Sequence, residues 1–366
     1  MAAAWISTDG GGGGDVYVAF SRNGGAGFGA PLRVNDIRGD ARPSEQQVPR
    51  VSLRGRQVAV VWTSRHDGTT EIRVAQSVDQ GATFSPSRRI SADGARGTRG
   101  WASVVVGEDD RIHVAWLDTR VAATQAASST TPTASASGAH VMGAGTHVMS
   151  SGTRQDLYEA VIDTDGTMTE HLVATNVCFC CKTSITQGAN STWIAYRDIY
   201  GDNYRDMSVA RIRRDDVERT RVSDDGWQIN GCPEDGPALA VGAHSLDIVW
   251  PTAVGTDGAT RGVFTASATS DGTFGPRFRL DGARGSAVHP ALARARNGDL
   301  AAVWEVTMNG SHRIERRIRR SGTWGPIEVV AAGESVSSPS VAEAQGRFVT
   351  AWTDKSGGVA TARVRY

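Results

Sequence analysis

The sequence predicts an all-β fold, and three observations support that prediction. Short alternating apolar segments recur along the 366 residues, which is the pattern of half-buried antiparallel strands. Turn residues, including 43 glycines, separate these segments, and long helical patterns are few. A strand that ends in an aromatic residue returns at intervals of roughly 50 residues, as a structural repeat would.

The repeat predicts a β-propeller made of four-stranded antiparallel blades. Each full unit holds four strand-like pieces, for example PRVSL, QVAVVW, EIRVAQS and the piece after GATFSP. A four-stranded sheet buries both of its faces only by stacking radially against its neighbours. The aromatic markers are Trp5, Trp62, Trp116, Tyr196, Trp250, Trp304 and Trp352.

The markers also bear on the number of blades and domains. Seven markers favour seven blades in one propeller domain spanning residues 1–366. Six blades are the alternative, because the first unit lacks its innermost strand in this sequence and the last lacks its outermost.

One interval between markers is longer because it contains an insert at 121–152. The first half of the insert is rich in Ala, Ser and Thr, so we expect it to be mobile. The second half repeats His-x-Met, with His140, Met142, His147 and Met149. Imidazole and thioether groups suit Cu(I) or Zn(II), and copper most if methionine takes part. An insert with accidental metal-like residues is the favoured alternative.

The hairpins between third and fourth strands carry a recurring turn motif. SVDQGATF at 77–84 fits the pattern S-x-D-x-G-x-x-F/W, and SRNGGAGF at 21–28 fits it with asparagine in the Asp position. The Asp or Asn side chain caps backbone N–H groups, glycine takes a positive φ, and the aromatic ring packs between sheets. The motif residues are Ser77, Asp79, Gly81 and Phe84, and Ser21, Asn23, Gly25 and Phe28.

Because of these motifs the chain resembles the BNR/Asp-box family of sialidase-like β-propellers over nearly its whole length. The segments CFCC, YRD…NYRD and GCPEDGP resemble those of bacterial exported BNR-repeat proteins. The scarcity of lysine beside abundant arginine is also typical of a GC-rich bacterial genome. The resemblance implies a propeller in a secreted or periplasmic setting, and it supplies no reaction of its own.

Sialidase activity is not expected to carry over from this resemblance. The family's enzymes use an F/Y-R-I-P motif, three arginines that bind the substrate carboxylate, a Tyr–Glu nucleophile pair and an Asp acid/base. No F/Y-R-I-P motif occurs here, although several arginines follow the marker strands. An exo-α-sialidase-type glycoside hydrolase and a pure interaction scaffold therefore remain the alternatives to a non-hydrolytic, ligand-binding propeller.

Charge and hydropathy exclude several partners. Lys plus Arg and Asp plus Glu both number 39, so the net charge is near zero and gives no reason to expect nucleic acid. No apolar run approaches the roughly 18 residues that span a bilayer, and no signal peptide is visible at the N-terminus. We expect a monomer that binds a carbohydrate or protein ligand at the channel mouth.

The four cysteines predict a cluster in space. Cys178, Cys180 and Cys181 lie in the loop that enters the innermost strand of one blade, and Cys232 lies in the corresponding loop of the next. In a propeller these loops share the face around the central channel, opposite the Asp-box turns. The cluster is expected to form disulfides, to bind a metal, copper or zinc, or to act as redox-active thiols.

Polar and aromatic residues near the cysteines form a candidate ligand-binding rim. Charged side chains in RDIYGDNYRD and GCPEDGP could contact a ligand or support a metal site, and Trp227 could stack on a sugar. Ordinary blade packing and turn capping are the alternatives for these residues. The rim residues are Arg197, Asp198, Asp202, Arg205, Asp206, Trp227 and Asp235.

Overall fold

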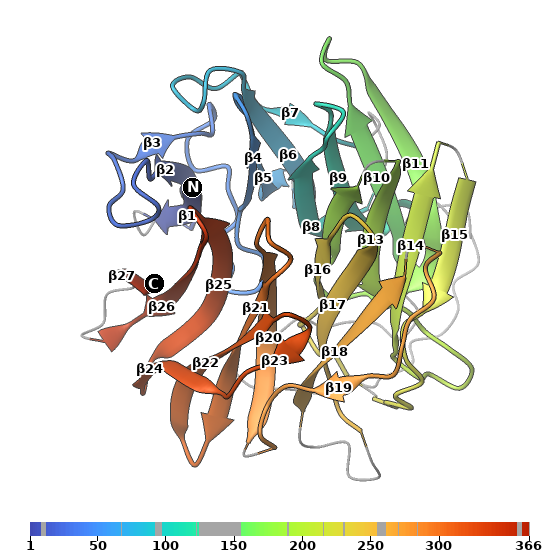
Figure 1. The fold of residues 1–366 in the computed structure, drawn as a ribbon. Coiled ribbons are helices and arrows are strands. Elements are labelled where there is room, and N and C mark those ends of the chain that lie inside the picture. Colours follow the sequence, from blue (N-terminus) through green and yellow to red (C-terminus); the bar gives the residue numbers. More distant parts are fainter. Residues whose placement is uncertain are drawn as a thin grey trace.

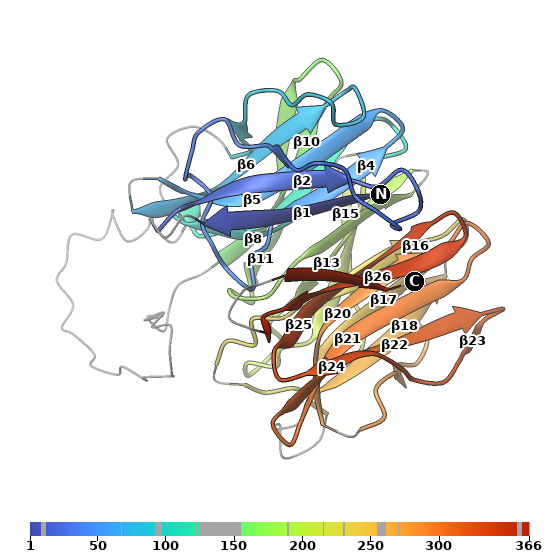
Figure 2. The same cartoon turned by 90° about the vertical axis from the view of Figure 1, so that its left-hand side faces the viewer.

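The computed structural model describes residues 1–8, 12–66, 68–91, 97–121, 123, 155–188, 190–214, 216–229, 231–254, 261–269, 271–283, 285–356 and 361–365. Small antiparallel sheets follow one another around a central axis, as Figure 1 shows from one end and Figure 2 from the side. The fold is therefore an all-β propeller, as the sequence predicts. The His-x-Met residues at 140–149 lie outside the described residues.

The first half of the chain supplies three groups of hydrogen-bonded strands. The first is β1 (Ala2–Thr8), β2 (Gly14–Phe20) and β3 (Leu32–Arg33). The second is β4 (Arg50–Arg54), β5 (Gln57–His66), β6 (Thr69–Ser77) and β7 (Arg88–Arg89). The third is β8 (Arg99–Val106), β9 (Ile112–Asp118), β10 (Gln155–Ile162) and β11 (Met168–Val177).

The second half supplies four more groups. The fourth is β12 (Ser184–Gly188), β13 (Ser191–Arg197), β14 (Met207–Arg213) and β15 (Asp216–Arg221). The fifth is β16 (Ala238–Val241), β17 (Ser245–Thr252), β18 (Gly262–Thr269) and β19 (Phe278–Arg279).

The sixth group is β20 (Ser286–Arg294), β21 (Leu300–Met308), β22 (Ser311–Arg320), β23 (Thr323–Trp324) and β24 (Glu328–Gly333). The seventh is β25 (Val336–Ala344), β26 (Arg347–Asp354) and β27 (Thr361–Arg365).

The blades number six when they are counted as continuous hydrogen-bonded sheets within the described ranges. Ala41 bridges Gly14 of β2 and Ser64 of β5, which joins the first two of the seven strand groups into one sheet. The structure thus has six blades, the alternative that the sequence left open. Seven markers overestimate this number because Trp5 and Trp62 both belong to the joined sheet.

The buried aromatic markers recur because each one packs against the group of strands before its own. Trp62 packs against Val16 and Val18 of β2, and Trp250 packs against Ala195 and Val209 of β13 and β14. Five markers are 0–1% exposed, namely Trp62, Trp116, Tyr196, Trp250 and Trp304. Trp5, in the first strand of the chain, is 36% exposed, so the apolar contact is weakest where the ring begins.

Six strands lie nearest the axis in the described part of the chain, and successive ones contact each other. They are β4, β8, β12, β16, β20 and β25 (Figure 1). Strand pairing with the marker strands gives these six strands one common register, for example Arg50 opposite Val61 and Ser184 opposite Ala195. We call the end of the ring where they begin the channel face. The equivalent positions there are Val48, Trp101, Lys182, Gly236, His289 and Ser338.

Three of these equivalent positions have a left-handed backbone held by the neighbouring blade. Trp101, His289 and Ser338 have φ values of 61°, 52° and 53°, and each lies in a register shift of its strand. The Trp101 N–H donates to Gln47 Oε1 over 3.1 Å, and the His289 N–H donates to Asp235 Oδ2 over 2.8 Å. A side-chain oxygen of one blade therefore fixes the backbone of the next.

The turn after β6 shows why the motif S-x-D-x-G-x-x-F at 77–84 has its residue types. Asp79 Oδ1 accepts from the Ser77 hydroxyl over 2.7 Å and from the Thr83 N–H over 3.0 Å. Gly81 has a φ of 84°, and a Cβ there would lie 2.1 Å from the Phe20 ring. Asn23 makes the corresponding bonds in the turn after β2. β6 is the third strand of its group, and β2 has the same place in a group that lacks the innermost strand. Both turns therefore lie opposite the channel face.

Candidate functional site

Three channel-face loops meet around the cysteines. The segment between β11 and β12 carries Cys178, Cys180 and Cys181, and the segment between β15 and β16 carries Cys232. The Cys178 N–H donates to the Arg197 carbonyl over 3.0 Å, and the Arg205 N–H donates to the Trp227 carbonyl over 2.8 Å. Backbone bonds thus tie the loop between β13 and β14 to both cysteine segments.

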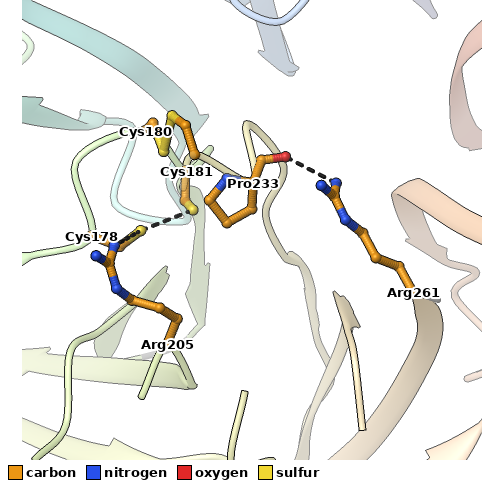
Figure 3. The surroundings of a disulfide bond; sticks show 7 residues. Cys178, Cys180, Cys181, Arg205, Pro233 and Arg261 are labelled. Carbon is orange, nitrogen blue, oxygen red and sulfur yellow. Dashed lines mark hydrogen bonds between the residues drawn. A yellow bond between two sulfur atoms is a disulfide. The ribbon is translucent and has the colours of Figure 1, made fainter. Parts of the chain in front are cut away.

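A disulfide links the two cysteine segments. Cys180 is bonded to Cys232, with their Cα atoms 5.8 Å apart (Figure 3). All four cysteines belong to one packed cluster with Trp101, and the disulfide joins two neighbouring blades. The structure therefore brings together the four residues that the topology predicts to be neighbours.

The other two cysteines are free thiols that are hydrogen-bonded to each other. Cys178 Sγ lies 3.3 Å from Cys181 Sγ and accepts a hydrogen bond from Arg205 Nη1 over 3.1 Å. The hydrogen bond from Cys181, with the charges of Arg197 and Arg205, lowers the pKa of Cys178 to about 6 although the thiol is buried. Burial raises the pKa of Cys181 well above its ordinary value. At neutral pH the pair therefore carries one negative charge, on Cys178.

The two arginines beside this thiolate are fixed by the surrounding backbone. Arg197 donates to the Arg205 carbonyl and the Pro251 carbonyl, each over 2.7 Å, and stacks over the Trp227 ring. Arg205 donates to Asn203 Oδ1 over 2.7 Å. Buried cations with such fixed positions stabilise a nearby anion more than exposed ones.

Most of the rim residues expected from the sequence are buried. Arg197, Arg205, Asp206, Trp227 and Asp235 are 0–6% exposed. Asp206 forms an ion pair with Arg221, and Asp235 accepts from the Gly236 and His289 N–H groups. Of the seven rim residues, only Asp198 and Asp202 keep appreciable open surface.

The sequence did not predict Gln47 and Lys182 as site residues, although both line an open hollow at the channel face. This hollow, of about 280 Å³ with its solvent opening included, is lined by Gln47, Arg50, Trp101 and Lys182, among others. The available signal was the common register of the first strands, which places Trp101 and Lys182 at equivalent positions. The hollow adjoins the cysteine cluster, because Lys182 follows Cys181 and Trp101 packs against the cysteines.

The arginines that follow the marker strands are dispersed. Arg120 forms ion pairs with Asp118 and Glu170 and lies over the Tyr158 ring. Arg197 and Arg205 surround the thiol pair, whereas Arg50 lines the hollow. Among the described residues these four side chains do not converge on one point.

The cysteine cluster has a donor set that could hold a soft metal ion. The sulfur atoms of Cys178, Cys180 and Cys181 lie within 4.8 Å of one another. Thiolate ligands select Cu(I) and Zn(II), with Zn–S distances of about 2.3 Å. Because Cys180 is committed to the disulfide, two thiols are available in this state, and reduction of that bond would bring the number to four.

The comparisons with known proteins identify a shared fold. No model of a known protein family matches the sequence, and no curated protein matches it. The propeller domain of the Trilobed protease from Pyrococcus furiosus superposes with a TM-score of 0.52 at 11% identity, covering 99% of this chain and 90% of that one. The common feature is the β-propeller.

Glycoside-processing propellers are similar to this chain at the same level. The intramolecular trans-sialidase from Ruminococcus gnavus has a TM-score of 0.51 at 9% identity, covering 86% of this chain and 93% of its own. The α-L-arabinofuranosidase Arb93A from Fusarium graminearum has a TM-score of 0.51 at 13% identity, covering 87% and 89%. At such identities the likeness shows the fold alone. Within the described residues, no helix has the length and hydropathy needed to cross a bilayer.

The thiol pair allows a direct test of its electrostatics. Thiolate absorbance in the ultraviolet is expected to decrease by one thiolate per molecule as the pH falls through about 6, because the pKa of Cys178 is lowered. Arg205→Met should move this midpoint to higher pH, since one of the stabilising cations is lost. Arg347→Met, which removes an exposed arginine, should not. An unshifted midpoint in Arg205→Met would contradict this account.

Proposed function

We propose that this chain is an exported, monomeric β-propeller that binds a carbohydrate or protein ligand at its channel face without hydrolysing sialosides. The observation that carries the proposal is the meeting of the cysteine cluster and the open hollow at one face. Structural disulfides persist in oxidising compartments, so the Cys180–Cys232 bond supports a secreted or periplasmic setting.

The distribution of charge argues against a sialidase-type reaction. Such chemistry would need a cluster of arginines on an open surface beside a nucleophile. Here Arg197 and Arg205 are buried and directed at a thiolate, and Arg120 is neutralised by two carboxylates. Ligand binding by the remaining open side chains is the function that this arrangement supports better.

A soft-metal site is the second candidate function, supported by the three neighbouring sulfur atoms. Cys178 and Cys181 would supply two thiolates to copper or zinc, and reduction of the disulfide would add Cys180 and Cys232. His140 or His147, with the adjoining methionines, would complete a copper site from the insert.

Three measurements on one preparation made without reductant test these proposals. Free-thiol titration should give two thiols per molecule, and a fluorogenic sialoside should show no turnover. Elemental analysis separates the candidates, since about one equivalent of copper or zinc that is lost in Cys178→Ser would establish the metal site. Turnover that disappears on Arg50→Gln would overturn the non-hydrolytic proposal.

A further inference from the structure

We infer that the hollow at the channel face is a binding site for a compact dianionic oxyanion, a sulfate or phosphate group, held between Arg50 and Lys182. This inference names the ligand chemistry of the channel-face site and rests on the binding function proposed above. The two cations lie at β4 and just before β12, on either side of β8, and line the same hollow.

Neither cation has a partner among the described residues. Arg50 and Lys182 make no side-chain hydrogen bond or ion pair there, in contrast to Arg120, Arg197 and Arg205. Two like charges that face one hollow repel each other, and removing them partly from water adds a further cost. An anion bound between them would remove both penalties.

The nearest carboxylates are already committed to other groups. Both oxygens of Asp235 accept backbone N–H groups, from Gly236 and His289. Glu305 accepts from the rings of His289 and His312 and from the Ser338 N–H. These carboxylates attract Lys182 from a distance without forming an ion pair with it, so the hollow keeps an excess of positive charge.

The electrostatics of the two side chains agree with this geometry. Burial lowers the pKa of Arg50, and burial together with the Arg50 charge lowers the pKa of Lys182, against the opposing pull of Asp235. Both side chains nevertheless keep part of their surface open to the hollow.

The lining selects the kind of group that fits. Two cations match the charge of a sulfate or phosphate group better than that of a single carboxylate. Gln47 Oε1 is occupied by the Trp101 N–H and the Thr63 hydroxyl, which leaves the amide nitrogen of Gln47 as a further donor. The hollow is open to solvent, so a bound oxyanion group would lie at its opening between the two cations, with the rest of a ligand outside the protein.

The chain offers an unusually simple test because Lys182 and Lys355 are its only lysines. Lysine labelled with carbon-13 at Cε should give two ε-methylene signals in a heteronuclear NMR spectrum, assigned by Lys355→Gln. On titration with inorganic sulfate or phosphate at constant ionic strength, the Lys182 signal should shift and saturate. The Lys355 signal should stay in place, because this lysine already forms an ion pair with Glu45 and is not part of the lining of the hollow.

Matched variants and ligands decide the outcome. Arg50→Gln should weaken sulfate binding by roughly tenfold, whereas Arg54→Gln, on the same strand and paired with Glu108 at the surface, should leave it unchanged. Acetate should bind more weakly than sulfate. Comparison of a sulfated monosaccharide with its unsulfated form distinguishes a sugar-borne group from a free ion, since only a sugar site gains affinity over inorganic sulfate.

Either of two results would overturn the inference. One is an equal shift of both lysine signals, which indicates general ion screening. The other is saturable binding that Arg50→Gln does not weaken while near-ultraviolet circular dichroism shows a folded protein. Sialoside turnover would overturn the proposed function and leave this result untouched, so the two failures can be told apart.

Discussion

Replacing Cys232 by serine is expected to lower the free energy of unfolding by about 2–5 kcal/mol. The Cys180–Cys232 bond closes a loop over a sequence separation of 52 residues and joins two blades at the channel face. Its loss frees the unfolded chain from that constraint and leaves Cys180 as a buried thiol next to two others. Chemical denaturation monitored by tryptophan fluorescence measures the change.

The second cysteine of the disulfide provides the control variants. Cys180→Ser should destabilise the protein by a similar amount, and the double variant should be little worse than either single one, because the same bond is lost. Adding reductant should destabilise the parent protein and leave these variants unaffected. Additive losses in the double variant would show that the two cysteines act separately, contrary to the structure.

Replacing Trp250 by alanine is expected to cost about 3–5 kcal/mol, because a fully buried indole leaves a cavity between two blades. The same change at Trp5, which is 36% exposed, should cost less than about 1 kcal/mol. Thermal and urea unfolding of the two variants provide the comparison. Equal decreases in the free energy of unfolding would mean that burial of the marker between strand groups does not determine its contribution to stability.

A phenylalanine pair separates the hydrogen bond from the packing. The Trp250 indole N–H donates to Asp225 over 2.8 Å, whereas the Trp304 N–H has no hydrogen-bond partner among the described residues. Trp250→Phe should therefore destabilise the protein more than Trp304→Phe, although both side chains are 0% exposed. The reverse order would contradict the role given to Asp225.

The fold was predictable from sequence because the packing repeats. A marker such as Trp304 must fill the same space against the preceding blade as Trp250 does, so both recur in the same strand context. The blade count was harder to predict. It depends on Ala41, an isolated bridging residue in a loop, and a bridge of that kind leaves no periodic signal.

The parts of the candidate site that depend on strand topology could be predicted from sequence. The parts that depend on side-chain packing could not. Two loops that enter neighbouring first strands must meet, which places Cys232 beside Cys180. Which cysteines pair depends on a few ångströms of loop geometry that spacing does not specify. Likewise, Arg197 and Lys182 look equally polar in sequence, but one is covered by Trp227 and the other faces the hollow.

The six equivalent positions at the channel face, with the charged residues around them, have a consequence for how a ligand is oriented. The backbone frame repeats around the axis, but the side chains on it are all different. Arg50 and Lys182 occupy the half of the ring formed by β4 to β12, and Asp235 and Glu305 occupy the half from β16 onward. The charges therefore do not follow the rotational symmetry of the backbone, because one side of the channel face is positive and the other is negative. A ligand that carries separated positive and negative charges would be held in one rotational orientation about the channel axis. A ligand with rotational symmetry would gain no binding energy from the repeated backbone.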